Sequence, residues 1–221
     1  MPSFLPGFQP VNRRLVDNFV LILLAAIGST AIPIFAGVFR LFRLKTEMAL
    51  LLCLLTLMLN FELYSLSLYL NGKNPYWLQH VYSPIEYIFV IVIFSFWIDN
   101  ARFRKMLFIS IPVFILLAVV TVMTFESLDI SNGFMASISC IAYIVVSLLV
   151  IHNIFTTKNG LVYKNYKFWV SAGFLLYSSG SILYFSFYDF LASYHLWLFH
   201  NICNVLANII FTIGFLCLPR R

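Results

Sequence analysis

Two glutamates and two histidines stand out because they lie inside long apolar stretches of the sequence. Glu62 and Glu86 carry carboxyl groups, and His80 carries an imidazole, as does His200, in a chain that is 62% hydrophobic and only 10% charged. Such groups can bind a ligand, exchange a proton or hold a metal ion. An ionisable side chain at membrane depth costs about 2.5 kcal/mol or more, so we expect all four to face the protein interior.

Helical spacing adds polar neighbours to these four residues. Side chains three, four or seven positions apart share one face of a helix. The ligand-binding residues expected from this pattern are Glu62, His80, Tyr82, Glu86, Tyr143, Tyr184, His200, Asn201 and Asn204. The same faces carry Gln79, Ser83, Cys140, Ser147, Tyr177, Ser181, Tyr188 and Asn208.

The elements that must position these residues are seven apolar stretches. A helix needs about 20 apolar residues to cross the hydrocarbon of a membrane, and the chain has a mean hydropathy of +0.95. The stretches cover residues 18–39, 47–70, 76–97, 106–125, 134–155, 168–188 and 195–217. We therefore predict an all-α integral membrane protein that forms a single domain over residues 1–221 and crosses the cell membrane, the cytoplasmic membrane in a bacterium, several times.

The basic residues predict how these helices are oriented. All but Arg13, Arg14 and Lys73 of the 14 basic residues fall in the loops 40–46, 98–105 and 156–167 or at the C-terminus. Lysine and arginine are enriched in cytoplasmic loops, so we predict an outside N-terminus and a cytoplasmic C-terminus. In that orientation Glu62 and Glu86 lie in the outer half, about 12 to 14 Å below the outer surface. We expect the basic loops to meet lipid headgroups and expect no nucleic-acid partner.

A short internal match suggests that the chain contains a repeat. Trp77-Leu78-x-His80 returns 120 residues later as Trp197-Leu198-x-His200, and a Leu-Tyr pair returns at the same offset. The match predicts two three-helix units, residues 18–97 and 134–217, joined by one linking helix. Two three-helix repeats of the same orientation need an odd number of helices between them, so that both start on the same side of the membrane.

This three-plus-one-plus-three layout with an outside N-terminus resembles the SWEET sugar transporters and, more loosely, rhodopsin and the seven-helix receptors. The sequence departs from each of these families in its motifs. It lacks the Pro-Gln motif of the wider transporter family, the Asp-Arg-Tyr and Asn-Pro-x-x-Tyr motifs of receptors, and a lysine in the last stretch that could hold retinal. We therefore assign the chain to no family on its sequence.

Three interpretations of the polar residues remain open. The first is structural, in which Glu62 and Glu86 join helices through hydrogen bonds to tyrosine and asparagine. The second is an outward-facing pocket for a small ligand or ion. The third is a metal or catalytic site, in which Glu62, Glu86 and His200 supply three ligands to a zinc ion; no linear metal or catalytic motif supports it, and the four cysteines have no zinc-type spacing.

From these interpretations we expect a sensor or accessory subunit that binds a small ligand or a partner membrane protein through its outer polar pocket. The alternative is a small-solute or proton-coupled transporter, in which a glutamate that gains and loses a proton couples the two movements. A further alternative is a metal-dependent lipid hydrolase. The sequence leaves open the ligand, any cofactor and the question of whether the chain is an enzyme.

Overall fold

The computed structural model describes residues 13–157, 161–187 and 194–219, and in these residues every regular element is a helix. Seven helices or helix pairs are long and apolar enough to cross a membrane, which confirms the expected all-α architecture. The bounds are α1 (Arg13–Ser29), α2 (Ala31–Phe39), η1 (Leu41–Arg43), α3 (Thr46–Leu70), α4 (Tyr76–Ser95), α5 (Ala101–Thr124), α6 (Gly133–Thr157), η2 (Val162–Lys164), α7 (Tyr166–Phe187) and α8 (Tyr194–Leu216).

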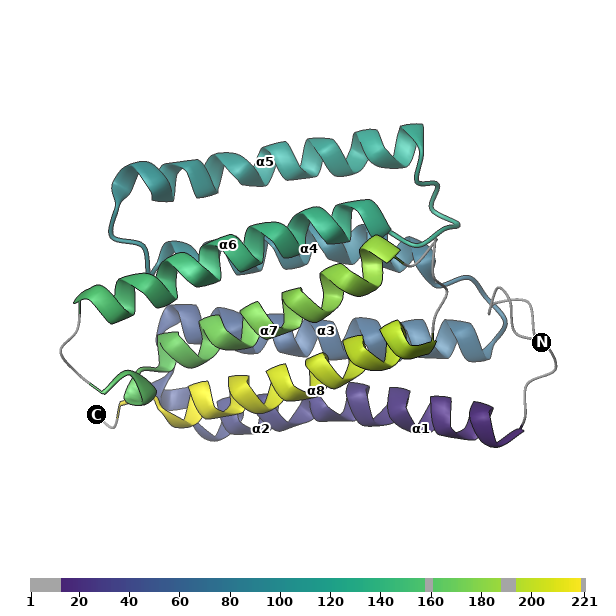
Figure 1. Cartoon of the computed structure of the whole chain (residues 1–221), viewed down its shortest axis with the longest axis horizontal. Helices are drawn as coiled ribbons and strands as arrows, with labels where there is room; N and C mark the ends of the chain where they lie inside the picture. Colours follow the sequence, from purple (N-terminus) through teal and green to yellow (C-terminus); the bar gives the residue numbers. More distant parts are fainter. Residues whose placement is uncertain (1–12, 158–160, 188–193, 220–221) are drawn as a thin grey trace.

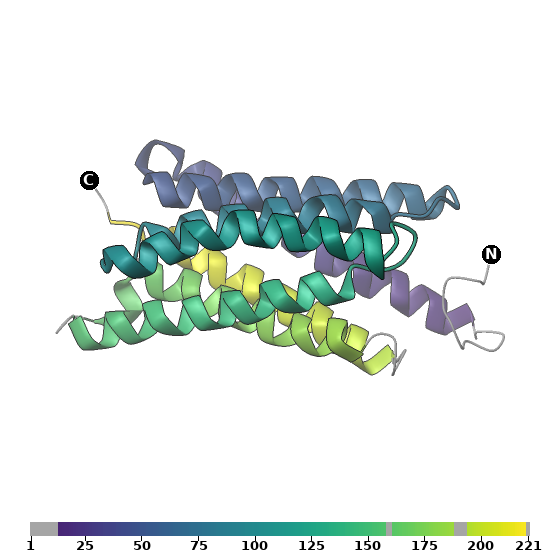
Figure 2. The same cartoon turned by 90° about the horizontal axis from the view of Figure 1, so that it is seen from above.

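The long helices run side by side and alternate in direction, as Figures 1 and 2 show. Helix α7 packs against α6 and α8, α8 packs against α1 and α2, α2 packs against α3, and α3 packs against α4. Contacts between α4 and α6 close this ring, and α5 lies outside it against α4 and α6 (Figure 1). We call the end that holds loops 71–75 and 125–132 the N-terminal face, and the opposite end, where α8 finishes, the C-terminal face.

The first apolar stretch, expected as one helix over 18–39, is two helices that meet at Thr30. Pro33 lies in the first turn of α2, where its ring and its missing N–H interrupt the hydrogen bonding of the preceding turn. The Nδ2 atom of Asn208 on α8 donates to Ser29 Oγ at 2.8 Å and to Thr30 Oγ1 at 3.2 Å. The neighbouring helix α8 therefore stabilises the break. Helices α1 and α2 together form one side of the ring.

Helices α7 and α8 approach closely because small residues line their contact. A Cβ atom added at Gly180 would lie 2.5 Å from Cys203 Cβ, and one added at Gly173 would lie 2.5 Å from a ring atom of Phe211. Small residues that allow such approach are a common device where helices pack in membranes. Gly173 and Gly180 thus allow the close approach of α7 and α8.

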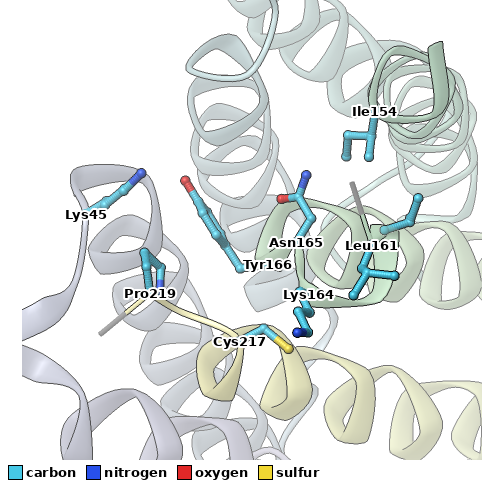
Figure 3. A pocket seen from close by; sticks show the side chains of 9 residues that line it. Lys45, Ile154, Leu161, Lys164, Asn165, Tyr166, Cys217 and Pro219 are labelled. Atoms are coloured by element: carbon cyan, nitrogen blue, oxygen red, sulfur yellow. The ribbon is translucent and has the colours of Figure 1, made fainter. Parts of the chain in front are cut away.

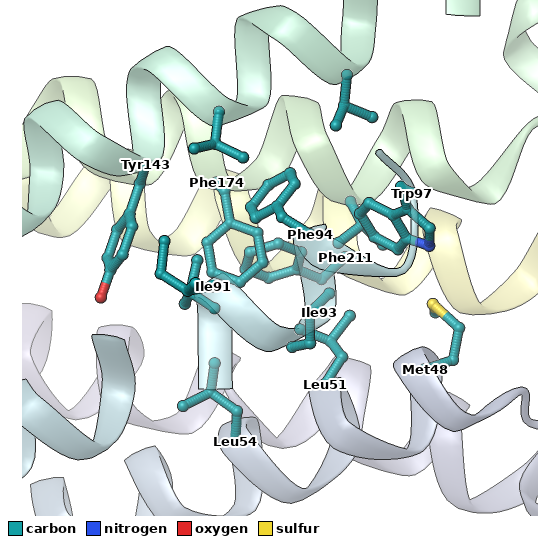
Figure 4. Packing of buried hydrophobic residues seen from close by; sticks show 14 of the residues in the cluster. Met48, Leu51, Leu54, Ile91, Ile93, Phe94, Trp97, Tyr143, Phe174 and Phe211 are labelled. Carbon is teal, nitrogen blue, oxygen red and sulfur yellow. The ribbon is translucent and has the colours of Figure 1, made fainter. Parts of the chain in front are cut away.

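The apolar core occupies mainly the half of the bundle next to the C-terminal face. It is built from the first half of α3, the second half of α4 and α6, the first half of α7 and the second half of α8. Figure 4 shows part of this cluster, including Met48, Leu51, Phe94, Phe174 and Phe211. Some buried polar side chains, such as Glu47 and Ser171, also lie in this half, and others lie toward the N-terminal face.

The outer surface of the helices is apolar. Phe35 on α2 and Leu116 on α5 are each 65% exposed, and Met123 on α5 is 81% exposed. Hydrophobic side chains in these numbers on the surface are what lipid contact requires. The orientation relative to the cell and the internal repeat stay predictions from the sequence.

Candidate functional site

Five polar side chains from four helices meet in the half of the bundle next to the N-terminal face. They are Glu62 of α3, Tyr82 and Glu86 of α4, Tyr143 of α6 and Tyr177 of α7, and we call them the Glu62–Glu86 cluster. Glu86 interacts electrostatically with Glu62 and with the side chain of Tyr177. Tyr82 interacts with both glutamates, and Tyr143 interacts with Glu86 and Tyr82. Two carboxyl groups that are 24 positions apart in the sequence are thus close enough to repel each other electrostatically.

Helix α4 places two members of the cluster by its register. Tyr82 and Glu86 are four residues apart, so they lie one above the other on the same helix face. Pro84 lies inside α4 between them. A proline has no N–H to donate, so the backbone carbonyl of His80, one turn earlier, has no helical donor. This stretch of α4 therefore lacks one helical hydrogen bond next to the polar side chains.

Several polar atoms in and around the cluster are buried and have no hydrogen-bond partner among the residues that the structure describes. In the cluster they are Glu62 Oε2, Tyr82 Oη and Tyr143 Oη, and beside it Ser83 Oγ, Ser147 Oγ and Ser178 Oγ. Buried polar groups in proteins are nearly always hydrogen-bonded, because an unpaired one costs about 1 to 3 kcal/mol. An unpaired set drawn from four helices is thus a place where a polar ligand would add hydrogen bonds.

The structural interpretation of the glutamates predicts that tyrosine and asparagine satisfy them. In the described part of the chain, Glu86 has a tyrosine partner, but one oxygen of Glu62 and two tyrosine hydroxyls are left unpaired. No asparagine contacts either glutamate through an interaction found in those residues. Hydrogen bonding between helices alone therefore does not account for the composition of the cluster.

His200 belongs to a second group that adjoins the first. Its ring stacks on Tyr184 with centroids 5.1 Å apart, and its Nδ1 atom lies 3.2 Å from Ser181 Oγ. The ring of Tyr177 is 6.4 Å from that of His200, so Tyr177 touches both groups. Two of the expected site residues, Tyr184 of α7 and His200 of α8, therefore lie next to the Glu62–Glu86 cluster and are joined to it through Tyr177.

His80 faces a loop, which the sequence pattern did not predict. Its Nε2 atom is 3.2 Å from the carbonyl oxygen of Ile130. Gln79 accepts hydrogen bonds from Ser131 Oγ at 3.2 Å and from the Asn132 backbone N–H at 3.3 Å. Loop 125–132 therefore packs over the start of α4 at the N-terminal face. No periodicity marks a loop residue, so only its polar composition could have hinted at this contact.

The three asparagines that share one face of α8, Asn201, Asn204 and Asn208, lie in three different environments. Asn201 donates to the carbonyl of Trp197 on its own helix at 2.8 Å. Asn208 holds the α1–α2 break, and Asn204 is buried with 5% exposure. Neither Asn201 nor Asn204 has a described contact with the Glu62–Glu86 cluster. Tyr188, which continues the α7 stripe in the sequence, lies outside the described residues.

The three residues suggested as zinc ligands are not grouped in the structure. Within residues 13–157, 161–187 and 194–219, no set of three histidine, cysteine, aspartate or glutamate side chains could hold a metal ion. His200 contacts Tyr184 and Ser181, whereas Glu86 interacts with Tyr177 and is repelled electrostatically by Glu62. The proposed triad of ligands therefore gains no geometric support.

No protein-family model, curated protein or solved structure matches this chain. Its layout can be compared with the SWEET transporters only at the level of the sequence-based prediction. What the chain does has to be argued from the residues of the site.

Proposed function

We propose that the chain binds a small polar ligand at the Glu62–Glu86 cluster and acts in the cell membrane as a sensor or accessory subunit. In the orientation predicted from the basic loops, the ligand arrives from the outside. The observation that supports this proposal is the set of buried, unpaired polar atoms contributed by α3, α4, α6 and α7. A ligand would supply the partners that the protein itself does not.

The cluster favours a ligand that carries several hydrogen-bond donors. Glu62 and Glu86 offer carboxyl oxygens, and the tyrosine and serine hydroxyls can both donate and accept. No lysine or arginine interacts with either glutamate among the described residues. An amine or a polyhydroxyl compound therefore suits the cluster better than an anion does. The Tyr82 ring, 5.1 Å from that of Phe61, adds an apolar surface for the rest of the ligand.

A sensor role follows from which helices the ligand would join. Helices α3 and α4 pack on each other, α6 and α7 do the same, and the cluster takes side chains from both pairs. A ligand that bonds to all four helices favours the arrangement in which the two pairs are close. Such a shift could be passed to a partner membrane protein along the apolar outer surface.

The first test is a thermal-unfolding screen of the purified chain in lipid nanodiscs against amines, amino acids and sugars. We expect at least one compound to raise the unfolding temperature of the wild type but not of Glu86→Gln. Glu47→Gln is the matched control, because Glu47 is also a buried glutamate but accepts a hydrogen bond from Tyr166 at the other end of the bundle. Equal responses of wild type and Glu86→Gln to every compound would rule out this site.

A proton-coupled carrier is the second candidate, and the electrostatic repulsion between Glu62 and Glu86 favours it. Two carboxyl groups in one apolar region repel each other when both are ionised, so a proton and a cationic solute would compete for them. Solute uptake into proteoliposomes that needs a pH gradient and disappears in Glu86→Gln would select the carrier over the sensor. Binding without uptake would select the sensor.

A further inference from the structure

A pocket of about 580 Å³ opens at the C-terminal face, far along the helices from the Glu62–Glu86 cluster. Figure 3 shows side chains from four parts of the chain around it: the start of α3, the end of α6, the segment from η2 to α7, and the residues after α8. The described lining consists of Lys45, Ile154, Leu161, Val162, Lys164, Asn165, Tyr166, Cys217 and Pro219.

The charge of this lining is positive. Lys45 and Lys164 contribute two ammonium groups, and no described lining residue is acidic. The Nζ atom of Lys45 lies 5.3 Å from the centre of the Tyr166 ring, and no lysine of the pocket has an ion-pair partner in the described part of the chain. The nearby acid, Glu47, is buried and accepts a hydrogen bond from Tyr166 Oη at 2.7 Å, which holds it behind the tyrosine.

Backbone and amide groups add further donors at the same place. Helix α7 begins at Tyr166, so the positive end of its dipole lies at the pocket. Asn165 Oδ1 accepts a hydrogen bond from the Lys167 N–H at 3.1 Å, while Asn165 Nδ2 is buried without a partner. An unpaired amide donor beside two lysines and a helix N-terminus is a combination that suits an anion with several oxygens.

The rest of the lining is apolar, and the pocket lies where the helices end. Ile154, Leu161, Val162 and Pro219 form walls that carry no charge. The apolar spans finish at this level, so the pocket opens near the boundary between lipid tails and headgroups. Pockets of some hundreds of cubic ångströms are the usual size for small-molecule sites.

We propose that this pocket binds the phosphate group of an anionic amphiphile, with Lys45, Lys164 and Asn165 on the phosphate oxygens and the apolar walls against the attached chain. Phosphate chemistry is shared by a phospholipid headgroup and a soluble phosphate, and the apolar walls favour the lipid. This site is separate from the Glu62–Glu86 cluster and does not depend on the function proposed there.

The proposal is tested by titrating the detergent-purified chain with short-chain phosphatidylglycerol, short-chain phosphatidylcholine or inorganic phosphate and following thermal unfolding. We expect phosphatidylglycerol to bind most tightly, and Lys45→Gln/Lys164→Gln to weaken that binding about thirty-fold, because each lysine near an anionic surface contributes about one kcal/mol. The control Arg102→Gln/Lys105→Gln removes two exposed charges at the same face and should bind as the wild type does.

Inorganic phosphate that binds tightly, and loses its affinity in the double lysine variant, would support the site with a soluble phosphate as its source. Two results would overturn the proposal: no preference for phosphatidylglycerol or inorganic phosphate over phosphatidylcholine, whose phosphate is neutralised by its own ammonium group, or an equal loss of binding in the double lysine variant and the arginine–lysine control.

Labelling of Cys217 gives a second measurement that needs no lysine variant to fold. Partial burial raises the pKa of the Cys217 thiol, so the maleimide reaction is run at a pH of about 9, where more of the reactive thiolate is present. Phosphatidylglycerol should slow labelling of Cys217, which lines the pocket, and leave labelling of the exposed Cys53 on α3 unchanged. Equal rates at Cys217 with and without the lipid would contradict the proposal.

Discussion

The tyrosines Tyr143 and Tyr166 are both buried, yet only one hydroxyl has a partner. Tyr166 Oη donates to Glu47 at 2.7 Å, whereas Tyr143 Oη is buried without a hydrogen bond in the described residues. An unpaired buried hydroxyl costs stability, and removing it relieves that cost. A protein keeps such a group when it serves something other than folding, which is why Tyr143 matters for the function proposed here.

The two tyrosines make a matched pair of variants. We expect Tyr143→Phe to leave the free energy of unfolding unchanged or to raise it by up to about 1 kcal/mol, because no bond is lost. Tyr166→Phe should lower it by about 1 to 3 kcal/mol, because Glu47 stays buried without its donor. Denaturant or thermal unfolding in nanodiscs measures both. A large destabilisation by Tyr143→Phe would mean that its hydroxyl has a structural partner, against the binding role.

Individual polar residues were predictable to different degrees. Glu62 and Glu86 could be assigned to the interior and to a common depth, since charge at membrane depth is costly and helical rise is constant. Which helices surround them could not be predicted, because helix order around the ring is set by packing between distant segments. His80 is grouped with the glutamates in the sequence because it is ionisable and lies in an apolar stretch, but its imidazole lies 3.2 Å from the carbonyl oxygen of Ile130 in a loop. Local spacing carries no information about which loop returns over a helix end.

At the scale of the elements, the contact between α7 and α8 depends on Gly180. We expect Gly180→Ala to destabilise the protein by about 1 to 3 kcal/mol, because its Cβ would lie 2.5 Å from Cys203 Cβ, which is fixed to the backbone and cannot turn away. Gly28→Ala on α1 is the control, since nothing lies within 4 Å of its added Cβ, and alanine favours helix. Thermal unfolding of both variants checks this. An unchanged Gly180→Ala would show that the two helices separate at little cost.

The break between α1 and α2 gives a second prediction for an element. Asn208→Ala removes the donor that bridges Ser29 and Thr30, and we expect a loss of about 1 kcal/mol, in the range for hydrogen bonds between membrane helices. Asn201→Ala is the control on the same helix, because in the described residues Asn201 donates to the backbone carbonyl of Trp197 on α8 itself. A lower unfolding temperature of Asn208→Ala but not of Asn201→Ala would show that the bridge stabilises the break, and equal temperatures would contradict it.

The bounds of most helices were predictable from the sequence, but the break between α1 and α2 was not. Apolar length and the charged loops fix where α3 to α8 start and finish to within a few residues, except that α5 begins at Ala101 and not at residue 106. The charge at the start of α5 predicts a loop, but it belongs to exposed side chains in the first turns of the helix, those of Arg102, Arg104 and Lys105. Pro33 signalled an interruption, but its stabilisation by a helix nearly 180 residues later follows only from the tertiary arrangement.

At the scale of the whole molecule, the ring is divided into an apolar half and a polar half along its axis. The apolar core fills the half next to the C-terminal face, and the Glu62–Glu86 cluster occupies the other. Loops 71–75 and 125–132 close over the polar half. The side of the membrane on which the N-terminal face lies therefore decides which compartment supplies the ligand.

That side can be measured directly. In a variant whose native cysteines are replaced by alanine, Lys73→Cys reports the N-terminal face and Lys105→Cys the C-terminal face, and both positions are exposed. The excess of basic residues at the C-terminal face predicts that it is cytoplasmic. A membrane-impermeant maleimide should therefore label Lys73→Cys in intact cells and Lys105→Cys only after permeabilisation. The reverse pattern would turn the cluster toward the cytoplasm, place the Lys45–Lys164 pocket at the outer leaflet, and require an intracellular ligand for the same polar residues.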